Sequence, residues 1–245
     1  MNNIELKNYL NNLLNIDKFK DYCPNGLQIE GKNEIKKIIT GVSCNLDLIK
    51  AAIDKNADGI LVHHGFFWKN EKLEITGIKQ KRIKLLLENN INLFAYHLPL
   101  DAHSTFGNNI AIANILDIKN PIPIGDTLVW QGEINQSLES LSENIANKLQ
   151  REPLVFGNKN KLIKKVAWCS GGAQSYIDYA IDFGVDCFIT GEVSEQIPAI
   201  AKENNIAFIS AGHHATEKGG VLALGKHLSE KFNLECEFVD IENIV

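Results

Sequence analysis

Histidines and acidic residues, the side chains that most often bind metal ions and transfer protons, gather at three points of this chain. His63 and His64 directly follow the apolar run GILV, and Asp101 follows the run INLFAYHLPL. His213 and Glu217 lie in the sequence HHATE, which comes after IAFISAG. Imidazole nitrogens combined with carboxylates favour borderline divalent ions such as Zn, Mn, Fe, Co or Ni over Ca or Mg. The residue types therefore predict a site for such an ion.

The number of candidate ligands indicates more than one ion. Five ligands exceed what a tetrahedral zinc ion with an open position takes from a protein. A carboxylate can bridge two ions roughly 3.5 to 4 Å apart, and this arrangement activates a bridging water in two-metal hydrolases. The five residues thus predict two divalent ions per chain and the chemistry of metal-assisted hydrolysis.

Local geometry leaves two choices open. Consecutive residues of a strand point to opposite sides, so His63 and His64 can serve one metal pair if the chain turns at the following glycine or if each binds a different ion. His213 and Glu217 are four residues apart and would share one face of a helix. His214 and Glu217, three residues apart, would share a face as well.

An internal repeat places these residues at matching points of two similar segments. Residues 34–65 align without gaps on residues 162–193, and each segment reads as a strand, a turn, an amphipathic helix and a second apolar strand. The tetrapeptide ENNI precedes a further strand in each copy. Identical pairs in the alignment include Lys36 and Lys164, Lys37 and Lys165, and Asp58 and Asp186. Such self-similarity indicates a duplicated βαβ unit.

The duplication predicts the fold class. Helices that alternate with buried strands are typical of an α/β protein with parallel or mixed sheets covered by helices. Two such lobes fit the length of the chain, and we expect residues 1–120 in the first and residues 121–245 in the second. Ligands of open α/β sheets gather at the carboxyl ends of the strands, which is where the candidate metal ligands lie.

Three residues near the candidate ligands have both a functional and a structural interpretation. His97 and His103 flank Asp101 and could donate hydrogen bonds to metal ligands or carry protons, or they could form plain loop hydrogen bonds. Glu192 occupies the position in the second copy that His64 occupies in the first. It could therefore face the same site, or it could be a solvated surface acid.

Two further segments could contribute to ligand binding. The turn SGGAQS at residues 170–175 could hold a phosphate on its backbone amides, but it lacks a GxGxxG or GKS/T signature, which favours a tight structural turn. Phe66, Phe67 and Trp68 could line a base-stacking pocket, or they could simply pack beside a sheet.

Composition excludes several classes of protein. A formal net charge of -5 provides no basic field for nucleic-acid backbones. The apolar runs are far shorter than the roughly 18 to 20 residues of a membrane-spanning helix, and the start MNNIELKNYL has no pattern of an export signal. The five cysteines are odd in number and form no CxxC pair, which argues against a disulfide framework or a thiolate zinc site. We therefore expect a cytoplasmic protein with reduced thiols.

Five motifs, in order along nearly the whole chain, resemble those of the Ngg-interacting-factor-three-like family. They are VHHGFFWK, YHLPLDAHSTFGNN, SGGAQSYI, TGE and AGHHATEKGG. The bacterial members of this family are commonly labelled GTP cyclohydrolase 1 type 2 homologs. The chain resembles their short form, because it has no extra central domain between the repeats.

The resemblance carries expectations of its own. It implies a dinuclear metal centre in a cleft between two intertwined, repeat-related α/β lobes, and subunits assembled into a ring-shaped homohexamer. By motif the metal ligands fall on His63, His64, Asp101, His213 and Glu217. The resemblance thus selects His213 over His214.

Together these observations lead to two functional hypotheses. The first is a metal-dependent hydrolase in which His97 or Glu192 moves protons, with GTP ring opening suggested by the family label and a nucleotide-like small molecule as the wider substrate class. The second is a non-catalytic metal-binding, scaffold or regulatory protein. The five ligands would be the same in both.

Overall fold

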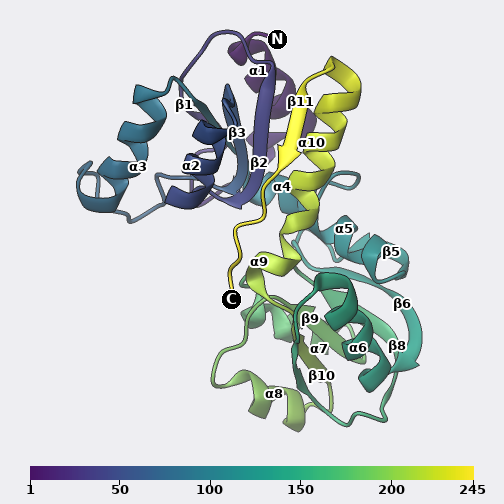
Figure 1. The fold of residues 1–245 in the computed structure, drawn as a ribbon. Coiled ribbons are helices and arrows are strands. Elements are labelled where there is room, and N and C mark those ends of the chain that lie inside the picture. Colours follow the sequence, from purple (N-terminus) through teal and green to yellow (C-terminus); the bar gives the residue numbers. More distant parts are fainter. The chain divides into compact units, whose positions relative to one another are not determined.

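Each copy of the repeat forms its own helix-covered sheet in the computed structural model, which describes residues 1–245 (Figure 1). The chain divides into two compact units. Unit 1 comprises residues 1–106 and 220–242, and unit 2 comprises residues 107–219 and 243–245. The boundary expected between residues 120 and 121 falls inside unit 2. No helix has both the length and the apolar composition that crossing a bilayer requires.

The sheet of unit 1 is mixed, in the order β1-β4-β3-β2-β11. Its neighbouring strands are parallel except that β1 runs antiparallel to β4. The elements of this unit are α1 (Asn3–Leu14), η1 (Ile16–Lys18), β1 (Gly26–Ile29), β2 (Lys37–Ser43), α2 (Leu46–Asp54), β3 (Gly59–His64), α3 (Gly77–Glu88), β4 (Asn92–Ala95), α4 (Leu98–Ala102), α10 (Lys218–Phe232) and β11 (Glu235–Phe238).

Alternating residues of the central strands β2, β3 and β4 in unit 1 enter two different hydrophobic cores. Ile60 and Val62 of β3 pack with buried residues of α2 and α3, whereas Leu61 between them packs with buried residues of α1 and α10. Because successive side chains of a strand point to opposite faces, the sheet is covered by helices on both sides. Figure 1 shows α2 and α3 beside the same face of this sheet.

The sheet of unit 2 is also mixed, in the order β5-β6-β8-β9-β10-β7. Strands β8, β9 and β10 are parallel, while β5, β6 and β7 pair antiparallel with their neighbours. The elements of this unit are α5 (Asn108–Ile115), β5 (Lys119–Pro123), β6 (Trp130–Ser137), α6 (Leu138–Leu149), β7 (Leu154–Phe156), β8 (Leu162–Trp168), η2 (Gln174–Tyr176), α7 (Ile177–Asp182), β9 (Cys187–Thr190), α8 (Ile197–Glu203), β10 (Ala207–Ser210) and α9 (His213–Thr216).

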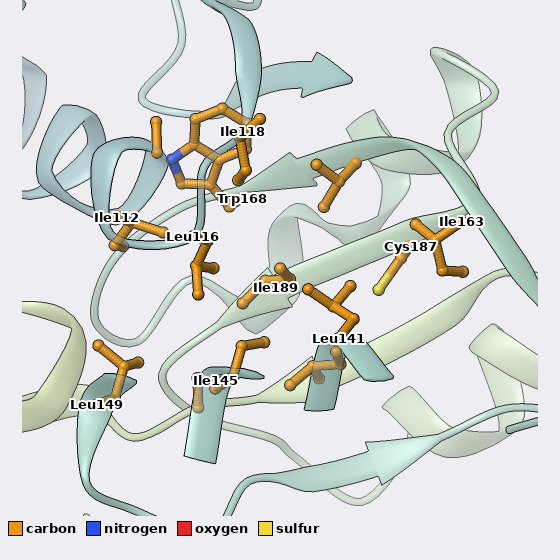
Figure 2. Packing of buried hydrophobic residues seen from close by; sticks show 14 of the residues in the cluster. Ile112, Leu116, Ile118, Leu141, Ile145, Leu149, Ile163, Trp168, Cys187 and Ile189 are labelled. Carbon is orange, nitrogen blue, oxygen red and sulfur yellow. The ribbon is translucent and has the colours of Figure 1, made fainter. Parts of the chain in front are cut away.

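Helices cover both faces of the second sheet too. Figure 2 shows Leu141 and Ile145 of α6 near Cys187 and Ile189 of β9, and all four side chains are buried. Phe188, which lies between the two residues of β9, belongs instead to the core formed with α7 and α8. The predicted fold class, two α/β halves with mixed sheets covered by helices, is therefore confirmed.

The identical residues of the two repeat copies make identical hydrogen bonds. Asp58 Oδ2 accepts the backbone N–H groups of Lys36 and Lys37 at 2.9 and 3.1 Å. In the second copy, Asp186 Oδ2 accepts the backbone N–H groups of Lys164 and Lys165, both at 2.9 Å. A carboxylate just before one strand thus binds two consecutive backbone amides of the neighbouring segment in each copy.

The shared ENNI tetrapeptides form the same turn at the end of a helix. Asn90 and Asn205 have φ values of 51° and 52°, in the left-handed region that asparagine tolerates better than most residues. The next residue returns its N–H to the helix in both copies, from Ile91 to Leu86 O and from Ile206 to Ala201 O, each at 3.0 Å. The turn then leads directly into β4 or β10, so the repeat determines where those two strands begin.

Candidate functional site

The two adjacent histidines of unit 1 are the last residues of β3 and are held by both neighbouring strands. His63 Nδ1 donates to the carbonyl oxygen of Tyr96 at 2.9 Å, just beyond the end of β4. His64 Nδ1 lies 3.0 Å from Ser43 Oγ at the end of β2. Their ring centroids are 4.6 Å apart although consecutive strand residues ordinarily diverge. Both imidazoles thus gather at the carboxyl end of the sheet.

The glycine after the histidines permits a close approach of three chain segments. A Cβ atom at Gly65 would lie 2.6 Å from Ala95 Cβ and would collide with Gln28 Oε1. Gln28 fastens the turn, because its Oε1 accepts the N–H of Phe66 at 2.7 Å and its Nε2 donates to Phe66 O at 3.1 Å. The expected turn at Gly65 is therefore present, although both histidines precede it within the strand.

Asp101 approaches the imidazole of His63. It lies in α4, the short helix that follows β4, and it is buried. Its Oδ2 is 3.5 Å from His63 Nε2, the ring nitrogen that does not face Tyr96. Unit 1 therefore brings three of the predicted ligands, His63, His64 and Asp101, to the carboxyl ends of β3 and β4.

His97, predicted to donate hydrogen bonds to metal ligands or to move protons, belongs to the same cluster. One ring nitrogen from each of His63, His64 and His97 lies within 4.8 Å of the others, so the three imidazoles could hold a metal ion. The carboxylate of Asp21 lies 2.7 Å from His97 Nδ1. Asp21 was missed by the sequence interpretation, because it belongs to no motif and lies 76 residues away from His97.

His103 forms hydrogen bonds within its own loop, which was the structural interpretation of this residue. Its Nδ1 accepts the backbone N–H groups of Thr105 and Phe106 at 3.1 and 3.0 Å, and its ring stacks on that of Phe106. Burial lowers its pKa below the usual value, which favours the neutral ring that such acceptance requires. His103 therefore stabilises the loop after α4.

Unit 2 brings together three predicted residues, His213, Glu217 and Glu192. His213 begins α9 and Glu217 caps its end, so four-residue spacing places His213 Nε2 3.2 Å from Glu217 Oε1. His213 Nδ1 lies 2.6 Å from Glu192 Oε1. Burial alone would lower the pKa of His213, but the hydrogen bonds and charges of Glu217 and Glu192 outweigh it and raise the pKa to about 9.

The SGGAQS turn packs directly against this pair. Gly171 has a φ of 68°, and a Cβ atom there would collide with Glu217 Oε1 and lie 3.2 Å from His213 Nε2. The N–H of Gly171 donates to Thr216 Oγ1 at 3.0 Å, and the N–H of Ala173 donates to Thr190 Oγ1 at 3.2 Å. Since these amides are used within unit 2, the turn has the structural character that was favoured over phosphate binding.

Of the three aromatic residues after the histidines, Phe66 and Phe67 pack against the same hydrophobic core, and Trp68 has a different environment. Phe66 is buried in the core between the sheet and α2 and α3, and Lys79 Nζ lies 5.2 Å from the ring of Phe67. Trp68 alone lies beside the histidine cluster, with its ring centroid 5.8 Å from that of His64 and 5.0 Å from that of His97. Packing thus explains Phe66, and Trp68 is the aromatic residue next to the candidate site.

The donors of both units suit a borderline divalent metal ion. Metal-binding histidines ordinarily give their second ring N–H to a carboxylate, a carbonyl or another protein acceptor, which leaves the remaining nitrogen for the metal. His63, His97 and His213 have such a partner on Nδ1, in Tyr96, Asp21 and Glu192. Carboxylate oxygens of Asp101 and Glu217 lie beside Nε2 of His63 and His213. This nitrogen and oxygen set is the chemistry expected for Zn, Mn, Fe, Co or Ni.

Comparisons with known proteins find relatives that match nearly the whole chain. A GTP cyclohydrolase 1 type 2 homolog of Haemophilus influenzae is 52% identical and aligns over 99% of both chains. Two solved structures, protein ybgI, described as of unknown function, and TTHA1606 from Thermus thermophilus, cover 100% of both chains at 46% and 32% identity, with TM-scores of 0.96 and 0.92. A family model described as Duf34/NIF3 (NGG1p interacting factor 3) matches residues 1–244. The resemblance of the motifs is thereby confirmed, and the chain belongs to the DUF34/NIF3 (NGG1p interacting factor 3) family.

Proposed function

We propose that this protein is a metal-dependent hydrolase that binds two divalent ions. The ligands in this proposal are His63, His64, Asp101, His213 and Glu217. The observation that carries it is the pairing of each carboxylate with an oriented imidazole: Nε2 lies 3.5 Å from Asp101 in one pair and 3.2 Å from Glu217 in the other. In both pairs a protein acceptor holds Nδ1, as metal-binding histidines require.

Bound ions of this kind lower the pKa of a coordinated water and polarise the substrate. The chain's own contribution to proton transfer is assigned to Glu192. Its side chain is 35% exposed, so it can meet a substrate or solvent, and one of its oxygens contacts His213 Nδ1. In this proposal Glu192 accepts a proton from the attacking water and passes it to the leaving group.

The proposed substrate is a nucleotide-like small molecule. GTP is the first compound to test, because relatives at 45–52% identity carry the name GTP cyclohydrolase 1 type 2 homolog. Trp68, partly exposed beside His64, offers a ring on which a base could stack. A ring-shaped homohexamer is part of the same proposal and is tested by the particle mass in solution.

The decisive experiment incubates metal-loaded protein with GTP and Mn²⁺ or Zn²⁺ and measures released formate and phosphate. We expect product from the wild type and none from Glu217→Ala. Glu139→Ala is the matched control, because Glu139 lies at the surface of the same unit and pairs with Lys159. Full metal content with unchanged GTP would refute GTP hydrolysis and favour the second function, a non-catalytic metal-binding or scaffold protein.

A further inference from the structure

We propose that His97 is an additional metal ligand, through Nε2, and that Asp21 is the residue that positions it. The proposal rests on the metal site of the proposed function and adds a ligand to it. It concerns unit 1 alone, where all the groups that carry it are found.

Asp21 and Asn25 hold His97 in one orientation. Oδ1 of Asp21 lies 2.7 Å from His97 Nδ1, and Oδ2 accepts from Leu98 N at 3.0 Å and from Asn25 Nδ2 at 2.8 Å. Asn25 Oδ1 in turn accepts the backbone N–H of His97 at 2.7 Å. Only 4% of the Asp21 side chain is exposed. The loop that contains Asp21 and Asn25 therefore fixes both the ring and the backbone of His97, and it buries the carboxylate of Asp21.

This orientation leaves Nε2 of His97 on the side of the two strand-end histidines. The ring centroid of His97 is 5.1 Å from that of His63 and 5.7 Å from that of His64. Because Nδ1 is occupied by Asp21, Nε2 is the nitrogen that remains for an ion held by the three-histidine cluster. Trp68 meets the ring of His97 edge-on and limits its tilt.

His63, His64 and His97 share a hydrogen-bonding arrangement that the other two histidines of unit 1, His103 and His227, lack. Nδ1 of His63, His64 and His97 faces Tyr96 O, Ser43 Oγ and Asp21 Oδ1, respectively. His103 uses Nδ1 as an acceptor for loop amides instead, and His227 pairs with the hydroxyl of Tyr9. A carboxylate on Nδ1 also makes Nε2 a stronger donor to a metal, since it raises the basicity of the ring.

A second group containing His97 is a weaker candidate for a metal site. Asp21, Cys23 and His97 also lie close enough together to hold an ion. However, Asp21 is saturated by hydrogen bonds on both oxygens. Burial and the charge of Asp21 raise the pKa of Cys23 to about 12, so its thiolate is disfavoured. His97 therefore belongs functionally with His63 and His64.

With His97 included, unit 1 supplies three imidazoles and the carboxylate of Asp101. The three imidazoles lie close enough together to hold one ion, and nitrogen ligands of this kind suit zinc or cobalt. We therefore expect one ion of the pair to depend on His97 and on its orientation by Asp21.

Titration of the full-length apoprotein with Co²⁺, followed by its visible absorption and by calorimetry, tests the proposal. We expect His97→Gln to weaken binding of one ion about 10- to 100-fold or more and to change the absorption spectrum. Asp21→Asn should weaken it less, up to about 10-fold, because an amide oxygen still accepts from Nδ1 but carries no charge. His103→Gln is the matched control and should leave both the affinity and the spectrum unchanged.

Proton NMR of the Co²⁺-loaded wild type tests directly whether His97 is bound to the metal, without first comparing the affinities of variants. A bound His97 gives an exchangeable, hyperfine-shifted Nδ1–H line, and this line should move in Asp21→Asn because the hydrogen-bond acceptor changes. Wild-type affinity and spectrum in His97→Gln, with binding lost in His63→Gln, would overturn this inference and leave the proposed metal site intact. A wild type that binds less than one Co²⁺ would overturn both.

Discussion

Replacement of Gly171 by alanine should disturb the proposed metal ligands of unit 2 without changing their own side chains. The added methyl group would collide with Glu217 Oε1 and lie 3.2 Å from His213 Nε2. Glu217 is 3% exposed and its Oε1 lies 3.2 Å from His213 Nε2, so its carboxylate cannot turn aside without leaving the imidazole. The collision must therefore displace the very group proposed to bind the metal.

Two costs contribute to the expected effect. A non-glycine residue in the left-handed region, at the φ of 68° found here, costs about 1–2 kcal/mol of folding free energy. Displacement of a ligand by its surroundings should lower metal affinity about 10- to 100-fold, the range found when the partners of metal ligands are altered. That loss corresponds to about 1.4–2.8 kcal/mol of binding free energy. Only the second cost affects metal binding.

Gly184→Ala separates the two costs. Gly184 lies in the same unit with a similar φ of 61°, but no atom lies within 4 Å of the position its Cβ would take. Gly171→Ala should lose at least as much stability as Gly184→Ala in urea denaturation of the apoprotein, because the collision adds to the backbone cost that both share. Only Gly171→Ala should bind Mn²⁺ or Co²⁺ more weakly in calorimetric titration. Equal metal affinity of Gly171→Ala and Gly184→Ala would refute the assignment of Glu217 as a ligand in the position described.

Three further predictions follow from the repeat and from the proposed site. Asp58→Ala and Asp186→Ala should each destabilise their unit by about 2 kcal/mol in urea denaturation, because each leaves two backbone N–H groups without their carboxylate acceptor. Asp58→Ala also loses the ion pair with Lys32, which is worth up to about 1 kcal/mol. Burial alone would raise the pKa of Asp58, but its hydrogen bonds from Lys32, Lys36 and Lys37 lower it below the usual 3.8. The stability that the Asp58 carboxylate contributes should therefore be complete above pH 3.8 and should disappear as the pH falls through the lower pKa of the folded state. Asp58→Asn should remove this part of the loss of stability in acid. An unchanged dependence of stability on pH in Asp58→Asn would contradict this prediction. Metal at 100 times its Kd should stabilise the wild type by about 2.7 kcal/mol in thermal unfolding and Glu217→Ala much less, whereas equal stabilisation would exclude that ligand.

The elements that carry the candidate ligands could be predicted because their signals are local. The run GILV ends in two histidines and forms β3, and the four-residue spacing of His213 and Glu217 is realised in α9 and its cap. The repeat predicted the matching positions of β4 and β10, each entered through an ENNI turn. Apolar periodicity, capping and turn residues are enough to place such elements.

Partners that are distant in the sequence could not be predicted in this way. Asp21 meets His97 only because β1 pairs antiparallel with β4 and brings the preceding loop to the end of that strand. The alignment of Glu192 with His64 predicted that it could face the candidate site, yet its contact with His213 depends on the neighbouring strands β9 and β10. The pairing of β11 with β2, across nearly the whole chain, has no local signal either.

The two copies of the repeat share their framework residues but differ at their strand ends, which explains how a duplicated unit can present different candidate ligands in each copy. The residues that define the framework, Asp58 and Asp186 together with the two ENNI turns, make the same hydrogen bonds in both copies. The strand ends differ: histidines close β3 and a carboxylate follows β4, whereas a carboxylate follows β9 and the His213–Glu217 pair follows β10. Because hydrogen bonding of the framework does not involve the strand ends, their side chains can change without loss of the fold. Exchanging the framework aspartates should therefore cost stability, and exchanging the strand-end residues should cost metal binding while the units stay folded.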